Sequence, residues 1–127
     1  MRRRSLTLAL MLMVPMLSAA AGFAAGPTDS RILFARQTEV PRPVQEFAWR
    51  VIETRCTYQS YERQQRSFWA YDAHARKVEA GVVYSIRIVS DLTWKKTQPS
   101  ALIAMIIVDN GRLQLTSLTS SFIACHI

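Results

Sequence analysis

The spacing of hydrophobic residues changes along the chain and divides it into three regions. Residues 6–17 form an uncharged, largely apolar run behind a start of three arginines, and mostly small residues follow as far as residue 25. This order is typical of a cleavable secretory signal peptide. The run of about twelve residues is shorter than the roughly 20 that a membrane-spanning helix needs. We therefore predict a signal peptide over residues 1–25 and no membrane anchor after its cleavage; a retained N-terminal anchor is the alternative.

The second region, residues 44–80, contains neither glycine nor proline. Pro43 suits the first turn of a helix, and the following apolar residues recur at helical spacing with charged residues between them. We predict a helix from this proline to about Tyr58, preceded by an extended N-terminal segment over residues 26–42. Within that segment, residues 31–36 could add a strand. The apolar face of the helix comprises Val44, Phe47, Ala48, Val51 and Ile52.

Residues 67–80 favour a second helix, because they are rich in alanine and basic residues and because Gly81 stands where a helix C-cap would. The alternative is a strand from Phe68 to Val78 that turns at Ala80 and Gly81. The four alanines of the segment disfavour that strand.

The last region is strand-like. Residues 82–89 are β-branched and aromatic, residues 91–100 are polar with a proline, and residues 101–108 are almost wholly apolar. The third segment therefore indicates a central strand covered on both faces. Asn110-Gly111 predicts a type I′ hairpin turn, and residues 112–123 alternate between apolar and polar.

These elements predict the α+β class. One or two N-terminal helices pack on an antiparallel meander of three strands, or four if residues 31–36 contribute one. Residues 43–127 then form a single small domain with one disulfide.

Charge narrows the choice of partner. The sequence has 16 Lys and Arg against nine Asp and Glu, and three of the arginines belong to the signal peptide, so the mature chain carries a net charge of about +4. A basic surface favours anionic partners such as lipopolysaccharide, anionic lipid, nucleic acid or an acidic protein, and disfavours a strongly basic one. A solvated basic surface without such a partner is the alternative.

Cys56 and Cys125 are the only cysteines. In an exported domain an even pair predicts a structural disulfide, which here closes a loop of about 70 residues. The alternative makes Cys125 a thiol nucleophile with the adjacent His126, although sequence neighbours seldom form a catalytic pair.

Aromatic and basic residues alternate between Phe47 and Tyr71. Aromatic rings offer stacking faces, and arginines bind phosphate or carboxylate; packing in the core is the alternative use of these rings. On one continuous helix, the arginines at 55, 63 and 66 would form a basic stripe beside two tyrosines. We expect the aromatics at 58, 61 and 69 to be the most exposed. The candidate binding surface comprises Arg55, Tyr58, Tyr61, Arg63, Arg66 and Trp69.

The sequence offers no recognisable catalytic or cofactor motif. It contains no phosphate-binding glycine loop, no Gly-x-Ser-x-Gly elbow and no calcium loop. His74 and His126 do not have zinc-site spacing once the cysteines are paired. We predict no metal and no cofactor. The leading hypothesis is a non-enzymatic periplasmic or secreted binding module for an anionic ligand or surface, or for a protein. The alternatives are a small secreted enzyme of hydrolase type and a secreted effector or inhibitor.

Overall fold

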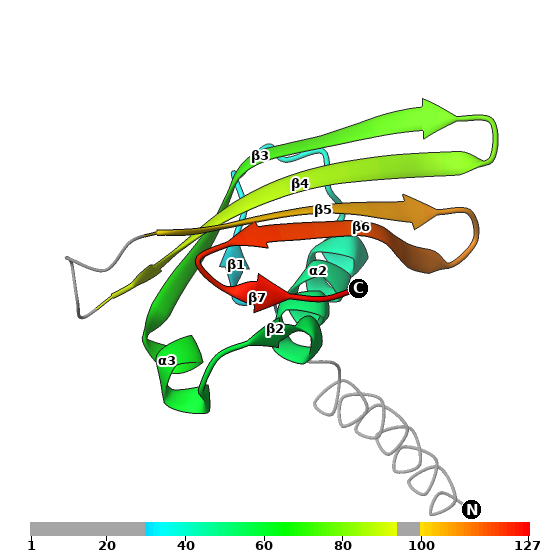
Figure 1. Cartoon of the computed structure of the whole chain (residues 1–127). Helices are drawn as coiled ribbons and strands as arrows, with labels where there is room; N and C mark the ends of the chain where they lie inside the picture. The colour runs from blue at the N-terminus through cyan, green and yellow to red at the C-terminus, as the bar shows by residue number, and fades with distance from the viewer. Residues whose placement is uncertain (1–29, 94–99) are drawn as a thin grey trace, which may run out of the picture.

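A computed structural model describes residues 30–93 and 100–127 (Figure 1). The predicted signal peptide and residues 94–99 of the predicted loop lie outside the described residues. Strands account for 54% of the structure and helices for 21%. In chain order the elements are β1 (Ile32–Leu33), α2 (Arg42–Arg55), β2 (Cys56–Thr57), α3 (Ser60–Gln65), β3 (Arg66–Val78), β4 (Gly81–Leu92), β5 (Ala101–Asp109), β6 (Leu113–Ser121) and β7 (Ala124–Cys125).

The strands form two sheets. The larger has five strands in the order β1-β3-β4-β5-β6, and the smaller pairs β2 with β7. Strands β3 to β6 are an antiparallel meander, and β1 joins β3 in parallel through Ile32 and Phe68. Residues 31–36 therefore do contribute a strand. In the small sheet Cys56 lies directly opposite Cys125.

The predicted α+β class is wrong. The described chain is mostly β, with a five-stranded mixed sheet and a two-stranded sheet in place of a three- or four-stranded meander under two helices. The main source of the error is the predicted helix over residues 67–80, which is the strand β3. The only helix besides α2 in the described ranges is the six-residue α3, which precedes β3.

β3 forms because its partner strand outweighs its own helical preference. It pairs with β4 from Arg66–Leu92 to Val78–Gly81 in one long hairpin, interrupted by a register shift near Tyr71. Its alanines at 70, 73 and 75 pack against the core. Cross-strand packing of this kind overrides intrinsic propensity. Gly81 is required by space, because a Cβ atom there would lie 2.0 Å from the carbonyl oxygen of Asp109.

α2 is the predicted first helix, but it ends at Arg55 rather than near residue 58. Pro41 precedes it in an extended conformation, and a proline occupies its first turn. The helix ends where the chain turns extended at Cys56 to pair with β7. Residues 50–66 are consequently divided between α2, β2, α3 and the first residue of β3, so the continuous helix assumed for the basic stripe does not exist.

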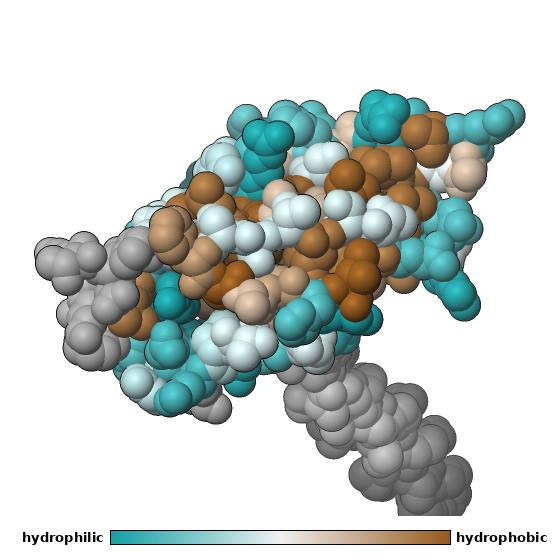
Figure 2. Space-filling view, viewed as in Figure 1, coloured by the Kyte–Doolittle hydropathy of each residue, from teal (hydrophilic) through white to brown (hydrophobic). Residues whose placement is uncertain are grey.

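The core lies between α2 and one face of the large sheet. Ile52 of α2 is fully buried, as are Ile88 of β4 and Ile107 of β5. The prediction that residues 101–108 are covered on both faces is wrong. Alternate residues of β5 are buried, whereas Leu102 on the other face is 45% exposed. Figure 2 shows hydrophobic side chains on the surface over the middle of the large sheet.

The predicted hairpin between β5 and β6 is present, but its turn is not the predicted type I′. Asp109 pairs with Leu113, so the loop has three residues. Gly111 has a φ of 111° and Asn110 does not have a positive φ. The Asp109 carboxylate accepts a hydrogen bond from the Gly111 N–H at 3.1 Å. This hydrogen bond to the Asp109 side chain stabilises the three-residue turn.

Candidate functional site

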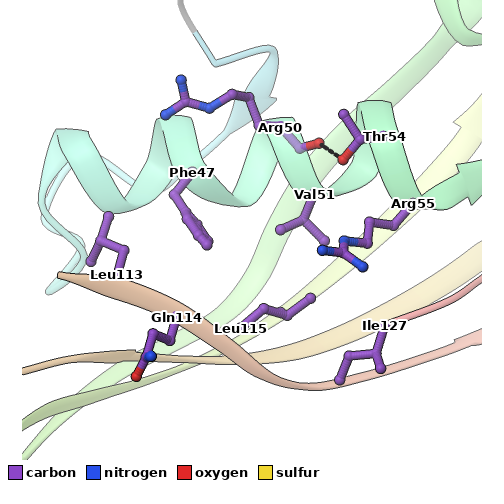
Figure 3. Close-up of a pocket in the computed structure, with 9 residues that line it drawn as sticks. All are labelled: Phe47, Arg50, Val51, Thr54, Arg55, Leu113, Gln114, Leu115 and Ile127. Atoms are coloured by element: carbon purple, nitrogen blue, oxygen red, sulfur yellow. Dashed lines mark hydrogen bonds between the residues drawn. The ribbon is translucent and has the colours of Figure 1, made fainter.

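A cleft of about 840 Å³ opens between α2 and β6 at the edge of the large sheet (Figure 3). This volume lies within the range of roughly 300–1,000 Å³ that is typical of small-ligand pockets. Phe47 and Val51 point from the helix toward the strand, and Leu113 and Leu115 face them from β6. The C-terminal Ile127 adds a fifth apolar side chain. The cleft therefore has an apolar interior.

Local periodicity explains this arrangement. Phe47 and Val51 are four residues apart, which places them one above the other on the same helix face. Leu113 and Leu115 are two residues apart, so both side chains lie on the same face of the strand, while Gln114 points away from the cleft. The helix and the strand each direct a pair of apolar side chains into the same space.

The polar residues that line the cleft are Arg50, Thr54 and Arg55 on α2 and Gln114 on β6, whose side chain points away from the cleft. Arg55 extends from the end of the helix toward the strand side, whereas Arg50 lies along the outer side of the helix (Figure 3). The Thr54 hydroxyl donates a hydrogen bond to the Arg50 carbonyl at 2.7 Å. No Asp or Glu side chain lines the cleft, and within residues 30–93 and 100–127 neither guanidinium forms an ion pair. The cleft therefore carries two arginines and no acidic side chain among its lining residues.

The disulfide holds one end of this cleft in place. Cys56 and Cys125 are bonded, as predicted, with their Cα atoms 3.9 Å apart. Beside the bridge, the His126 N–H donates a hydrogen bond to the Arg55 carbonyl at 2.9 Å. These two links fix the C-terminal residues against the end of α2 and so position Ile127 at the cleft. The disulfide is typical of an oxidising, extracytoplasmic environment. Because both sulfurs are bonded, Cys125 is not a free thiol nucleophile in this structure.

The six residues of the predicted binding surface do not form one surface. Arg55 lines the cleft, and Tyr61 is exposed on α3. Trp69 pairs with Val89 on the sheet face away from α2, where it is half-buried. The other three residues are close together, because the guanidinium carbons of Arg63 and Arg66 lie 5.6 Å and 6.0 Å from the ring centre of Tyr58.

The group around Tyr58 is packed against the core. The ring of Tyr58 lies 6.3 Å from that of Phe68, which in turn contacts the buried Trp49 edge-on at 5.3 Å. The Arg66 side chain is 10% exposed, and its Nη2 lies 3.4 Å from a carboxylate oxygen of Glu62. Its other two nitrogens and the Tyr58 hydroxyl are buried without hydrogen-bond partners. We call Tyr58, Arg63 and Arg66 the tyrosine cluster.

Burial raises the pKa of Tyr58 to about 12, although the nearby positive charges of Arg63 and Arg66 act to lower it. Desolvation disfavours the charged phenolate more than the two guanidiniums favour it. The hydroxyl is therefore neutral at physiological pH. The tyrosine packs as an uncharged ring under two arginines.

Comparison with known proteins adds no relative: no protein family, no curated protein and no solved structure matches the chain. No helix of the described residues is long and apolar enough to span a membrane. Within the same ranges, no three His, Cys, Asp or Glu side chains are grouped closely enough to hold a metal ion.

Of the residues that line the cleft, only Arg55 belongs to the predicted binding surface. Residue spacing assigned Phe47 and Val51 to the apolar face of a helix and Leu113 and Leu115 to an alternating strand, which is correct for each element. The spacing of residues within each element does not predict how far apart α2 and β6 lie at the sheet edge. The signal that was available is the pair of arginines at 50 and 55, because Arg50 adjoins Val51 in the sequence and Arg55 follows Val51 by four residues, about one helical turn.

Proposed function

We propose that this protein is an exported, non-enzymatic binding module, and that the cleft between α2 and β6 binds a ligand with an apolar body and an anionic group. The apolar body would contact Phe47, Val51, Leu113 and Leu115. The anionic group would pair with Arg55, and Arg50 would contribute a second positive charge at the outer side. A guanidinium is suited to either carboxylate or phosphate.

Export is supported by two independent features. The first 25 residues have the order of charge, hydrophobicity and small residues of a secretory signal peptide. The Cys56–Cys125 bridge is of a kind that persists outside the cytoplasm. Intact mass of the exported protein is expected to show a new N-terminus between residues 20 and 26. A mature protein that still begins at Met1 would contradict this part of the proposal.

One observation carries the binding proposal: the apolar cleft is bordered by arginines that have no carboxylate partner in the described chain. Arg66, which packs against the core, is instead paired with Glu62. A ligand that supplies both an apolar body and an anion would satisfy both parts of the cleft at once.

A pair of matched fluorescent probes tests this proposal. Anilinonaphthalene sulfonate carries an anionic sulfonate, whereas N-phenylnaphthylamine has a closely similar ring system without charge. We expect saturable binding of both to the oxidised protein, with the sulfonate bound more tightly at low salt and its advantage reduced at high salt.

The Arg55→Gln substitution should lower the affinity for anilinonaphthalene sulfonate by about threefold to fivefold, as expected for the loss of an exposed ion pair. It should leave the affinity for the neutral probe unchanged. Arg76→Gln is the matched control, because Arg76 is an exposed arginine of β3 outside the cleft. Failure of both probes to bind the wild-type protein would exclude the cleft as a ligand site. An equal loss of affinity for both probes in Arg55→Gln would show that Arg55 shapes the cleft and does not bind the anion.

A further inference from the structure

The cleft borders a sheet edge that is open to a further strand. β6 is the last strand of the large sheet and, within the part of the chain that the structure describes, pairs with β5 alone. Near its C-terminal end the chain folds back over it: the Ser120 hydroxyl donates to the Ile123 carbonyl and accepts from the Cys125 N–H. The first residues of the strand, Leu113 to Leu115, have no such cover among the described residues, and they are the ones that line the cleft.

The composition of β6 does not protect this edge. Natural sheet edges are usually blocked by charged side chains, by proline or by covering segments, because an unpaired row of backbone groups invites another strand. β6 contains no charged residue and no proline. Its one irregularity is an extra residue, Thr116, where the register with β5 shifts. An added strand would therefore pair with residues 113–115, before this bulge.

The opposite edge of the same sheet is protected. Beyond the two residues that pair with β1, β3 carries Asp72, His74 and Arg76. The side chain of Glu39 accepts a hydrogen bond from the Ala75 N–H at 2.8 Å, which occupies a donor of that edge. The sheet therefore has one edge that is charged and partly covered, and one that carries no charged residue and is covered only near its C-terminal end.

The overhang of α2 gives an added strand a place for its side chains. Every second side chain of such a strand would lie on the same sheet face as Leu113 and Leu115 and enter the cleft beneath Phe47 and Val51. The intervening side chains would point away, as Gln114 does. Backbone pairing and apolar contacts would thus be made at the same time.

Charge determines what kind of strand fits. A second copy of this chain added at β6 would bring two sets of Arg50 and Arg55 together, in a mature protein with a net charge of about +4. Like charges placed together at an interface disfavour that pairing. A segment with an acidic residue facing the cleft would instead neutralise Arg55.

We propose that the occupant of the cleft is an extended acidic peptide segment of another protein, which pairs with residues 113–115 of β6 as a sixth strand. Its alternate apolar side chains fill the space under α2, and a carboxylate binds Arg55. This proposal rests on the proposed function, because it names the ligand of the same cleft.

The test uses the acetylated, amidated peptide Val-Thr-Val-Thr-Asp and a control of the same composition, Val-Val-Thr-Thr-Asp, in which the alternation is broken. We expect the alternating peptide to bind and to compete with anilinonaphthalene sulfonate, and the control to bind at least about fivefold more weakly. Arg55→Gln should weaken the alternating peptide by about threefold to fivefold, and Arg76→Gln should not.

Backbone methylation distinguishes strand addition from side-chain binding. Only alternate N–H groups of a strand face its neighbour. We therefore expect methylation of one alternate set of peptide nitrogens to weaken binding by about tenfold or more, and methylation of the other set to have little effect. On the protein, hydrogen exchange measured by NMR should slow at the amides of residues 113–115 that do not bond to β5.

Equal sensitivity to both methylated sets, or unchanged exchange in β6 with peptide bound, would overturn the strand proposal. So would concentration-dependent dimerisation through β6. If neither peptide binds while anilinonaphthalene sulfonate still binds in an Arg55-dependent manner, the peptide proposal fails and the proposed function stands. If no probe of either kind binds, both fail.

Discussion

The tyrosine cluster and the cleft both place arginines beside apolar or aromatic side chains, and the two regions differ in what the guanidiniums face. In the tyrosine cluster, Arg66 is almost entirely buried, lies against the Tyr58 ring and pairs with Glu62. In the cleft, Arg55 is exposed, has no carboxylate partner in the described chain and lies beside an apolar space. The two regions use similar residue types and are separated by only a few residues of sequence.

This difference shows that mixing arginine with aromatic residues does not by itself indicate a binding site. The tyrosine cluster fills its own space, so its arginines serve the packing of α3 against the core. The cleft leaves its space open, so its arginines remain available to a ligand. Four experiments test this distinction between a packed cluster and an open cleft.

The largest effect is expected from removing the disulfide. Cys56→Ser with Cys125→Ser should lower the free energy of unfolding by roughly 2–5 kcal/mol, because the bridge closes a loop with a sequence separation of 69. Since the bridge also holds Ile127 at the cleft, affinity for anilinonaphthalene sulfonate should fall as well. Denaturant unfolding and probe titration measure the two effects. An unchanged affinity in a folded variant would show that the cleft does not depend on its C-terminal wall.

The next effect concerns Arg66, for which two substitutions separate packing from charge. Arg66→Ala should destabilise the protein by about 2 kcal/mol, because it removes a side chain packed on Tyr58. Arg66→Met retains most of that packing and removes two buried nitrogens that lack hydrogen-bond partners, so its stability should lie within about 1 kcal/mol of wild type. Neither change should alter anilinonaphthalene sulfonate binding. A loss of anion binding in the stable Arg66→Met variant would make the tyrosine cluster a binding site after all.

The sequence predicted parts of the molecule that depend on local rules. The first helix follows from the spacing of Val44 and Ile52, and the disulfide follows from two cysteines in an exported chain. The second helix was predicted wrongly because alanines favour helix locally, whereas residues 66–78 gain more from pairing along the whole of β4. The cleft could not be predicted for a related reason. It depends on how far α2 stands from β6, and that distance is set by the packing of the entire sheet.

A smaller effect is expected from Tyr58→Phe, which removes a buried hydroxyl that has no hydrogen-bond partner. The variant should be equal to wild type or more stable by up to about 1 kcal/mol at neutral pH. Because the folded pKa of about 12 exceeds the ordinary value of 10.0, folding favours the neutral form. That contribution is complete below pH 10 and is lost as the pH rises through 10 toward 12. Unfolding measured from pH 8 to pH 12 should therefore show a steeper loss of stability in wild type than in the variant. Identical pH profiles would contradict the burial of this hydroxyl.

The smallest effect is expected at Tyr61, the most exposed aromatic of the predicted binding surface at 57%. Tyr61→Ala should change the free energy of unfolding by less than about 0.5 kcal/mol, because the side chain makes no packed contact with the core. It should leave anilinonaphthalene sulfonate and peptide binding unchanged, since the residue lies on α3 and outside the cleft. The remaining role for this ring is stacking on a polyanion held by nearby arginines. In that case Tyr61→Ala would lower the affinity for single-stranded DNA without changing the dependence of that affinity on salt, because stacking releases no counter-ions. Titration of wild type and Tyr61→Ala with single-stranded DNA at two salt concentrations measures this directly. A reduced affinity with an unchanged salt slope would assign a second binding surface to α3, whereas no difference between the two proteins would exclude Tyr61 from binding and leave the cleft as the proposed site.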